Sequence, residues 1–541
     1  MSHLPCGRRA RVLFLVAGAF VALVLSGAPA RARTPADMAV IAWQLDELIS
    51  LDPAEAYEFA GAEIAANVYD RLVYYNIDAP EEILGGIAER WDIGADGRTY
   101  TFHIRDGVRF QSGNPVTALD AAWSLQRVVL LNKGPAFILT QLGLTPDTVA
   151  RRVRAVDERT LVLETDRPFA PSFVLNGLGS WVSSVLDRQT VLAHEENGDL
   201  GNGWLKTHTA GSGPFSLGVW RPNEMVLLNR FEGYWQGAPA MKRVALRHVP
   251  ESAPQRLMLE KGDADIARNL SPDDQAALAR NPAITVRRVP QSALYYLGLN
   301  QKNPILARPE VREALKWLID YEGIERNILQ GSKKPHQTFL PEGFPGALAD
   351  TPYHLDLERA RALLAQAGLA DGFSVTMDVR NTYPTADVAQ VIQATWAKVG
   401  IHLEILPGDN KQTLTRYRAR QHDIYIGRWA PDYLDPHGNA QGFAWNPDNS
   451  DTSPTTLLAW RNNWVIPDLT ARTEAALVEP DSGVRRQRYQ DLQRAVLADS
   501  PYVIMFQDIN VIAERVGVTG FAVGPNFDVV YYRAIRKDSG S

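Results

Sequence analysis

The sequence DVAQVIQATWAKVGIHLEIL, residues 387–406, joins a helix-forming segment directly to a strand-forming one. The segment from Asp387 to Lys398 predicts a helix, and Gly400 follows at the place where a glycine commonly ends one. The residues after it, Ile401 to Leu406, are mostly aliphatic and predict a strand. This order is the repeating unit of an α/β layer, in which helices cover a sheet.

The same order of helix and strand recurs on both sides of this unit. Leu357 to Ala367 predicts a helix stopped by Gly368, and Ser374 to Val379 predicts the strand after it. The alternation therefore predicts an α/β fold for the second half of the chain. Three further elements are expected there: a helix that begins at Pro309, a helix over Arg485–Leu497 and a strand over Tyr502–Ile512.

The first half of the chain contains clear strand and helix signals of its own. Thr99 to Arg105 alternates polar and apolar residues, which places Tyr100, Phe102 and Ile104 on one face of a strand. Thr117, followed three residues later by Asp120, predicts a capped helix start. Two more strands are expected, over residues 160–165 and 225–229.

The first 32 residues have the order of a secretory signal peptide. Three arginines, Arg8, Arg9 and Arg11, precede the apolar run Val12–Leu25, and small residues follow. This run is shorter than the ~20 residues needed to span a bilayer, so we expect cleavage after Ala30 or Ala32 rather than an anchor. The pair Arg8-Arg9 hints at the twin-arginine route, but the surrounding residues favour the general one. The signal predicts a periplasmic protein.

The chain has a single cysteine, Cys6, which precedes the apolar run. Cys6 would be removed with the signal, so the mature protein is expected to be neither a lipoprotein nor a thiol enzyme or thiolate metal protein. Removal of residues 1–32 takes away four arginines and no acid, and the net charge of −6 becomes −10. This acidic balance disfavours a nucleic-acid or anionic-membrane partner.

The usual catalytic motifs are missing. Gly211-Ser212-Gly213-Pro214 lacks the spacing of a nucleophile elbow, and no phosphate-binding or dinucleotide-binding glycine motif occurs. His194-Glu195-Glu196-Asn197 lacks the second histidine of a zinc helix. We therefore expect a binding protein without a cofactor, and an exported hydrolase is the disfavoured alternative.

The segment after residue 423 carries the strongest indication of a ligand site. Asp423 to Trp429 predicts a buried strand, which would place Trp429, Asp432 and Tyr433 at or beyond its carboxyl end. In open α/β sheets ligands bind at that end. An aromatic face beside a carboxylate suits a ligand with a cationic amine and an apolar body. An acidic turn beside a core tryptophan is the alternative.

Asp435 and His437 follow in the same segment and leave a second alternative open. Two carboxylates and an imidazole within six residues are a possible metal constellation, with His437 as a candidate ligand. A turn around Pro436 accounts for the same residues without a metal.

Several segments together resemble the family 5 solute-binding proteins of ABC importers, which include dipeptide-, oligopeptide- and nickel-binding receptors. A match of any one segment would be weak evidence. The resemblance rests on the order in which all of them occur along most of the mature chain. The segments include NVYDRLV (67–73), DGRTYTFHIRDGVRF (96–110), GNPVTALD (113–120), GSGPF (211–215), GDAD (262–265) and VREAL (311–315).

The resemblance implies a two-lobed periplasmic-binding-protein clamp of type II, similar to cluster C, with an extra subdomain in the first lobe. The hinge is expected near Tyr295-Tyr296 and Met505-Phe506. The implied divisions are lobe I over residues 33–294, its subdomain over about 75–210, lobe II over 295–506 and a return to lobe I over 507–541.

The resemblance also implies a role for particular residues. In peptide-binding members an aspartate three residues after a tryptophan receives the ligand's amine, and Trp429-Ala430-Pro431-Asp432 matches that spacing. Asp432 is thus the first choice and Asp435 the second. Trp429 would line a pocket, and Tyr57 and Phe59 are candidates from lobe I.

The implied function is that of a monomeric receptor. It would close around a peptide or peptide-like amine and deliver it to an inner-membrane ABC permease with its ATPase subunits. A metal chelate, for which Asp435 and His437 would matter more than Asp432, an opine or a sugar are alternative ligands on the same fold.

Overall fold

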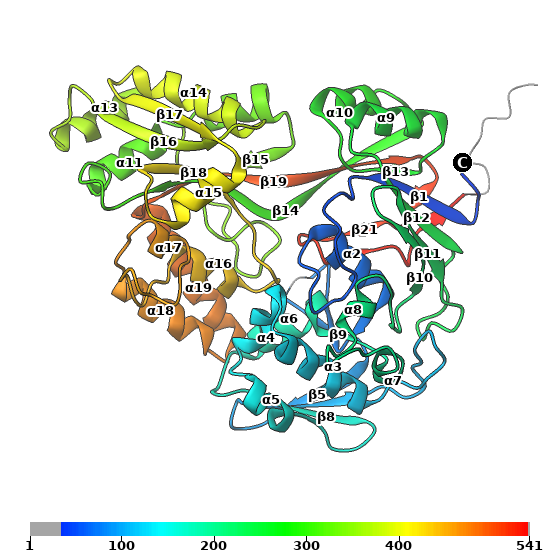
Figure 1. Ribbon diagram of the computed structural model, residues 1–541. Helices are drawn as coiled ribbons and strands as arrows, with labels where there is room; N and C mark the ends of the chain where they lie inside the picture. The colour runs from blue at the N-terminus through cyan, green and yellow to red at the C-terminus, as the bar shows by residue number, and fades with distance from the viewer. Residues whose placement is uncertain (1–33, 80, 539–541) are drawn as a thin grey trace, which may run out of the picture.

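The computed structural model describes residues 34–79 and 81–538 (Figure 1). The predicted signal peptide and Cys6 lie outside these residues. Among the helices of the described part, none combines the length and apolar character needed to cross a lipid bilayer.

Two long antiparallel strands, β14 (Ile284–Leu299) and β19 (Tyr502–Arg515), run through the centre of an 11-stranded sheet and connect two lobes (Figure 1). The predicted strand over Tyr502–Ile512 is confirmed by β19. On the lobe I side lie β10 (Phe215–Arg221), β11 (Met225–Arg230), β12 (Arg243–His248), β1 (Met38–Trp43) and β13 (Ile266–Ala267). On the lobe II side lie β18 (Ile424–Trp429), β16 (Ser374–Arg380) and β17 (His402–Gly408), with β15 (Lys333–Pro335) beside β19.

Lobe II is the α/β layer that the sequence predicts. Gly368 and Gly400 have φ values of +72° and +82°, the left-handed conformation that ends a helix. Apolar side chains such as Leu315, Ile392 and Trp396 form a core between the helices and the sheet. The helices of this core are α11 (Pro309–Trp317), α13 (Leu357–Gln366) and α14 (Thr385–Ala397), close to their predicted ranges. Figure 1 shows α13 and α14 above the sheet.

A group of helices packs on the opposite face of the lobe II sheet (Figure 1). Its longest member, α19, begins after the capping residue Asp481 and confirms the helix predicted over Arg485–Leu497. Phe443 and Tyr502 pack edge to face with ring centroids 4.9 Å apart and join this group to β19. The group comprises α15 (Asn410–Arg418), α16 (Pro436–Phe443), α17 (Leu458–Arg461), α18 (Pro467–Leu477) and α19 (Ser482–Ala498), while the short α12 (Tyr321–Ile324) precedes β15.

Lobe I adds a four-stranded sheet and the helix α3 (Ala118–Leu131) to its share of the central sheet. Tyr100, Phe102 and Ile104 are buried on one face, and Thr117 and Asp120 form the predicted capping box. The small sheet has the order β5 (Ala88–Ile93), β6 (Thr99–Ile104), β8 (Thr160–Glu164) and β7 (Val153–Ala155). It lies within the segment 75–210, whose limits as a subdomain stay a prediction.

Shorter elements complete lobe I. The helix α2 begins at Phe59 and α6 begins at Pro171, and both face lobe II. The elements are α2 (Phe59–Val68), β2 (Asp70–Arg71), β3 (Val73–Tyr75), β4 (Ile83–Gly85), α4 (Phe137–Thr140), α5 (Pro146–Arg152), α6 (Pro171–Leu178), β9 (Ser184–Val185), α7 (Arg188–Leu192), α8 (Asn202–Leu205), α9 (Ser252–Lys261) and α10 (Pro272–Ala279).

The C-terminal tail returns to lobe I and is bonded into its core. Arg71 forms a buried ion pair with Asp528, and the Asn67 side chain donates to the carbonyl of Val530. The tail contains β20 (Val518–Thr519), β21 (Ala522–Val523), β22 (Val530–Tyr531) and β23 (Arg536–Lys537).

The pairing of β14 with β19 is irregular between Pro290 and Leu294 and again between Tyr295 and Tyr296. These irregularities lie where the two strands pass from lobe I to lobe II. The hinge positions and the lobe limits stay predictions.

Candidate functional site

The candidate site lies where the end of β18 and the loop after it face the start of α2. The Tyr57 hydroxyl, from lobe I, donates a hydrogen bond of 2.9 Å to Asp432 Oδ1, from lobe II. Tyr57 is 44% exposed, whereas Asp432 is half-buried. The structure thus brings together two residues predicted independently for opposite lobes.

Asp432 is a desolvated carboxylate without a cation. Among the described residues no arginine, lysine or histidine forms an ion pair with it, and the Tyr57 hydroxyl is its one hydrogen-bond partner. Burial raises the pKa of Asp432 to about 6, although the hydrogen bond from Tyr57 partly opposes this shift. Burying a charge without a partner is unfavourable, so a positively charged ligand group would provide the counter-charge that Asp432 lacks.

Aromatic side chains form the lobe I wall of the site. Phe59 stacks on Phe527 with ring centroids 4.8 Å apart, and Tyr57 stacks on Trp181 at 6.3 Å. Phe59 remains 37% exposed, so this wall presents apolar surface on the lobe I side of the site. Sequence reasoning missed Trp181 and Phe527, because no local pattern connects either residue with the segment around residue 57.

Trp429, the last residue of β18, is held in place rather than free. Its indole Nε1 donates to Asn439 Oδ1 over 3.1 Å, and its ring packs edge to face on Phe443 at 6.3 Å. The side chain is half-buried. This geometry agrees with a residue that forms a fixed side of a pocket, which stays a prediction.

Tyr433 packs between the two lobes. It is buried, its ring meets Phe173 of α6 edge to face at 6.1 Å, and its hydroxyl donates to Gln141 Oε1 over 3.3 Å. Tyr433 therefore contributes to the contact between the lobes, and the structure places no open surface over its ring.

Asp435 caps a helix and neutralises an arginine. It is fully buried at the N-cap of α16, where it accepts a 2.8 Å hydrogen bond from the backbone N–H of His437. Arg485 of α19 donates to both carboxylate oxygens, over 2.8 and 3.0 Å. Burial works to raise the pKa of Asp435, but Arg485 and the hydrogen bonds from His437 and Asn176 together outweigh it, and the pKa is lowered. The structure thus favours the turn-capping alternative over ligand contact.

His437 lies buried behind Asp435. Its ring packs edge to face on Phe173 at 5.4 Å, and its Nδ1 is 3.3 Å from the hydroxyl of Tyr489. Burial lowers the pKa of His437 to about 3, so the imidazole is neutral. Within residues 34–79 and 81–538, no group of three or more histidine, cysteine or acidic residues is arranged to hold a metal ion.

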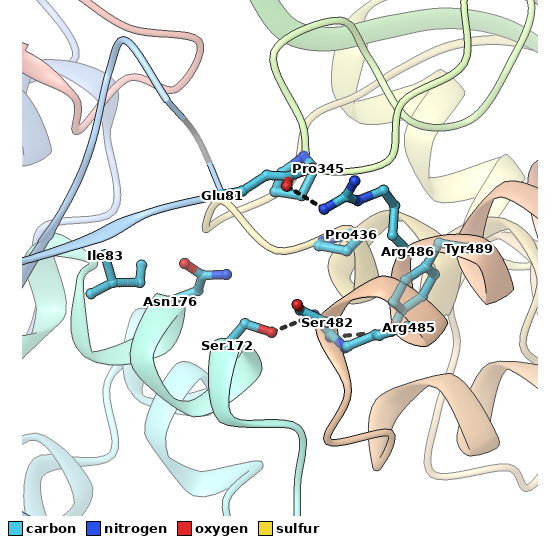
Figure 2. A pocket seen from close by; sticks show the side chains of 10 residues that line it. All are labelled: Glu81, Ile83, Ser172, Asn176, Pro345, Pro436, Ser482, Arg485, Arg486 and Tyr489. Atoms are coloured by element: carbon cyan, nitrogen blue, oxygen red, sulfur yellow. Dashed lines mark hydrogen bonds and ion pairs between the residues drawn. The ribbon is translucent and has the colours of Figure 1, made fainter. Parts of the chain in front are cut away.

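The Asp435–Arg485 pair also connects the two lobes. Figure 2 shows its arginine, Arg485, near Ser172 and Asn176 of α6. Ser172 and Asn176, both on α6 of lobe I, complete it: Arg485 donates to Ser172 Oγ over 2.9 Å, and Asn176 donates to Asp435 Oδ2 over 3.0 Å. We call these four residues the interlobe clasp. A cavity lined by members of the clasp and by Glu81 and Arg486 lies beside it, and Asp432 is not among its lining residues.

Two lobes joined by two crossing strands, with an unpaired carboxylate and exposed aromatic rings between them, define a ligand-binding clamp. The chain belongs to the bacterial extracellular solute-binding proteins, family 5, whose model matches residues 82–451. It is 30% identical over 507 residues to the "Probable D,D-dipeptide-binding periplasmic protein DdpA" of Escherichia coli K12, covering 93% of this chain and 94% of that one.

Solved structures of similar proteins have the same fold. HbpA2 from Haemophilus parasuis superposes with a TM-score of 0.82 at 23% identity, covering 93% of this chain and all of that one. The periplasmic binding protein DppA from Helicobacter pylori, in complex with the peptide STSA, superposes with a TM-score of 0.73 at 25% identity, covering 92% and 98%. The predicted fold class and family are confirmed.

Proposed function

We propose that this protein is the receptor of an ABC importer and binds a short peptide or peptide-like amine between its lobes. The observation that carries the proposal is Asp432, a desolvated carboxylate whose hydrogen bond to Tyr57 spans the two lobes. The relatives support it, since one is named for D,D-dipeptide binding and a similar structure holds the peptide STSA.

Closure would follow from contacts that the ligand makes with both lobes. A ligand amine bonded to Asp432 and an apolar side chain against Phe59 favour the closed form by the extra contacts that closure provides. A charged hydrogen bond to Asp432 contributes about 1.5–3 kcal/mol, enough to bias closure without determining the affinity alone.

The remaining parts of the proposal concern where and with whom the protein acts. We propose a monomer that reaches the periplasm by the signal at residues 1–32, is not lipidated and catalyses no reaction. Its partners would be an inner-membrane permease and that permease's ATPase subunits. The signal-like order of the first 32 residues and the periplasmic relative support this assignment.

The ligand class is tested on protein purified from its own periplasm. Native mass spectrometry should show a bound mass that the solvent-denatured protein lacks, and tandem spectra should identify a peptide or peptide-like amine. Thermal-shift assays with dipeptides, an opine, a sugar and a nickel chelate provide the comparison. A shift from the opine, sugar or chelate and none from any dipeptide would contradict the proposal.

The affinity for an amine ligand should depend on pH through Asp432. Because the carboxylate is the binding form and its pKa is about 6, the affinity should be constant above pH 7 and fall about tenfold per pH unit below 5. Isothermal titration with one dipeptide between pH 4.5 and 8 measures this profile. An affinity that does not change over this range would exclude an ionised Asp432 as the amine partner.

A further inference from the structure

A cavity of about 320 Å³ lies in lobe I, apart from the interlobe site. Its walls come mainly from the β3–β4 hairpin, the last turn of α2, the loop after β11 and the C-terminal tail. All of these segments precede β14 or follow β19, and neither Tyr57 nor Asp432 is among the lining residues. Pockets that bind small molecules have volumes of about 300–1,000 Å³, so this cavity is large enough for a ligand of its own.

Tyrosine rings line the cavity, and two of them have their hydroxyls bonded in the interior of the lobe. The hydroxyls of Tyr74 and Tyr234 both donate to Asp70 Oδ1, over 2.6 and 3.1 Å, and Asp70 is fully buried. Tyr531 meets Tyr74 edge to face with ring centroids 6.3 Å apart, and Leu84, which is 45% exposed, adds aliphatic surface. Because the two hydroxyls are bonded to the buried carboxylate, these residues offer the cavity mainly carbon atoms, which suit a flat apolar ligand body.

The lining contains one cation, Arg533, whose charge is unpaired. Arg533 is exposed, and within the described part of the chain its side chain takes part in no hydrogen bond or ion pair. Burial raises the pKa of Tyr531 to about 12, but the positive charges of Arg71 and Arg533 oppose this shift, so the Arg533 guanidinium acts on the Tyr531 hydroxyl. Asp78, the one acid of the lining, forms no ion pair with Arg533 in the described structure. The cavity therefore combines ring surface with a guanidinium that is available to an anion.

We propose that this cavity is a second binding site, for a small organic anion with a flat apolar body whose carboxylate pairs with Arg533. A guanidinium donates two parallel hydrogen bonds to a carboxylate, and the tyrosine rings contact the apolar body. Gln236, another exposed residue of the lining, has a side chain without a hydrogen-bond partner among the described residues, and its amide adds a donor for the same anion. The site is separate from the cleft between the lobes, so it does not depend on the proposed function.

The test titrates the wild-type protein with 2-naphthoate and with 2-naphthylmethylamine, which has the same ring system and the opposite charge. Isothermal titration should give an affinity at least about tenfold higher for the acid, because the amine makes no charged hydrogen bond to Arg533 and is repelled by it. Arg533→Gln should bind 2-naphthoate about tenfold more weakly and so bring the two affinities together. Gln236→Glu keeps the size of the side chain but adds a carboxylate to the lining, so it should weaken 2-naphthoate by a similar factor and should not weaken the amine.

The control is Arg494→Gln, which changes an exposed arginine of α19 outside the lining and should leave both affinities unchanged. Arg533 and Gln236 are exposed and unpartnered in the described structure, so their replacement should not lower the melting temperature. Equal binding of acid and amine by wild type, or no binding of 2-naphthoate, would overturn the inference. An unchanged affinity for 2-naphthoate in both Arg533→Gln and Gln236→Glu would place the anion elsewhere in the protein and overturn it as well. None of these results bears on peptide binding between the lobes, so the proposed function is tested separately.

Discussion

Replacing Asp432 with asparagine should strongly weaken peptide binding and at the same time stabilise the empty protein at neutral pH. Removal of one partner from a buried charge pair costs about 2–5 kcal/mol, so the affinity for a dipeptide should fall by at least about 30-fold. Asparagine keeps the size of the side chain and still accepts the Tyr57 hydrogen bond. The titration that measures the pH profile gives the affinity of the variant directly.

The stabilisation follows from the raised pKa of Asp432. The carboxyl group has a pKa of about 6 in the folded protein, above the ordinary aspartate value of 3.8, so its ionisation costs stability as the pH rises through this interval. At pH 7.5 the ionised Asp432 lowers the free energy of unfolding by the full amount, roughly 2–3 kcal/mol, and below pH 4 this loss is absent. Asp432→Asn should therefore raise the melting temperature of the empty protein at pH 7.5 but not at pH 4.

The control for Asp432 is Asp448→Asn, which alters an exposed carboxylate of the same lobe and should change neither affinity nor stability. Retained dipeptide binding by Asp432→Asn would exclude Asp432 as the amine partner. A melting temperature that falls at pH 7.5 would show that Asp432 stabilises the empty protein, contrary to its unpaired state.

Replacing Arg485 with alanine should destabilise the protein by about 3–5 kcal/mol, the largest effect on stability that we expect from a single substitution. The side chains of Arg485 and Asp435 are only 5% and 0% exposed, so the variant leaves a buried carboxylate without its cation. Ser172 would also lose the hydrogen bond that it accepts from Arg485 across the lobes. Urea unfolding at pH 7.5, followed by tryptophan fluorescence, measures the loss.

The adjacent residue provides a matched control. Arg486 pairs with Glu81 across the same boundary, but the two side chains are 45% and 47% exposed. Exposed ion pairs contribute about 0–1 kcal/mol, so Arg486→Ala should cost less than 1 kcal/mol. Equal losses of unfolding free energy for the two variants would show that the buried pair stabilises the protein no more than the exposed pair does. The comparison separates the contribution of burial to stability from the contribution of a salt bridge at the surface.

The elements of lobe II were predictable because their signals are local. Gly368 and Gly400 end two helices by the same left-handed geometry that the sequence suggests, and Asp481 caps α19 one helical turn before the range expected from its pattern. The alternation in Thr99–Arg105 likewise decided which side chains of β6 are buried. Such signals involve residues a few positions apart, which a sequence displays directly.

The partners within the site were not predictable in this way. Tyr57 and Asp432 are 375 residues apart, and their contact depends on how the crossing strands orient the two lobes. Asp435 has the same chemistry as Asp432 three positions earlier, yet it is buried against Arg485, which follows 50 residues later. The difference between the unpaired Asp432 carboxylate and the ion-paired Asp435 carboxylate was therefore decided by tertiary packing, not by residue type or spacing.

The path of the chain through both lobes has a consequence for the order in which they fold. Most of lobe II is one continuous stretch between β14 and β19, whereas the core of lobe I includes the hydrogen bond from Asn67 to Val530, a separation of 463 residues. Contacts between residues so far apart form slowly, and domains tend to fold as units. We therefore expect lobe II to reach its native packing before lobe I, whose core is complete only when the last strand and the C-terminal tail are in place.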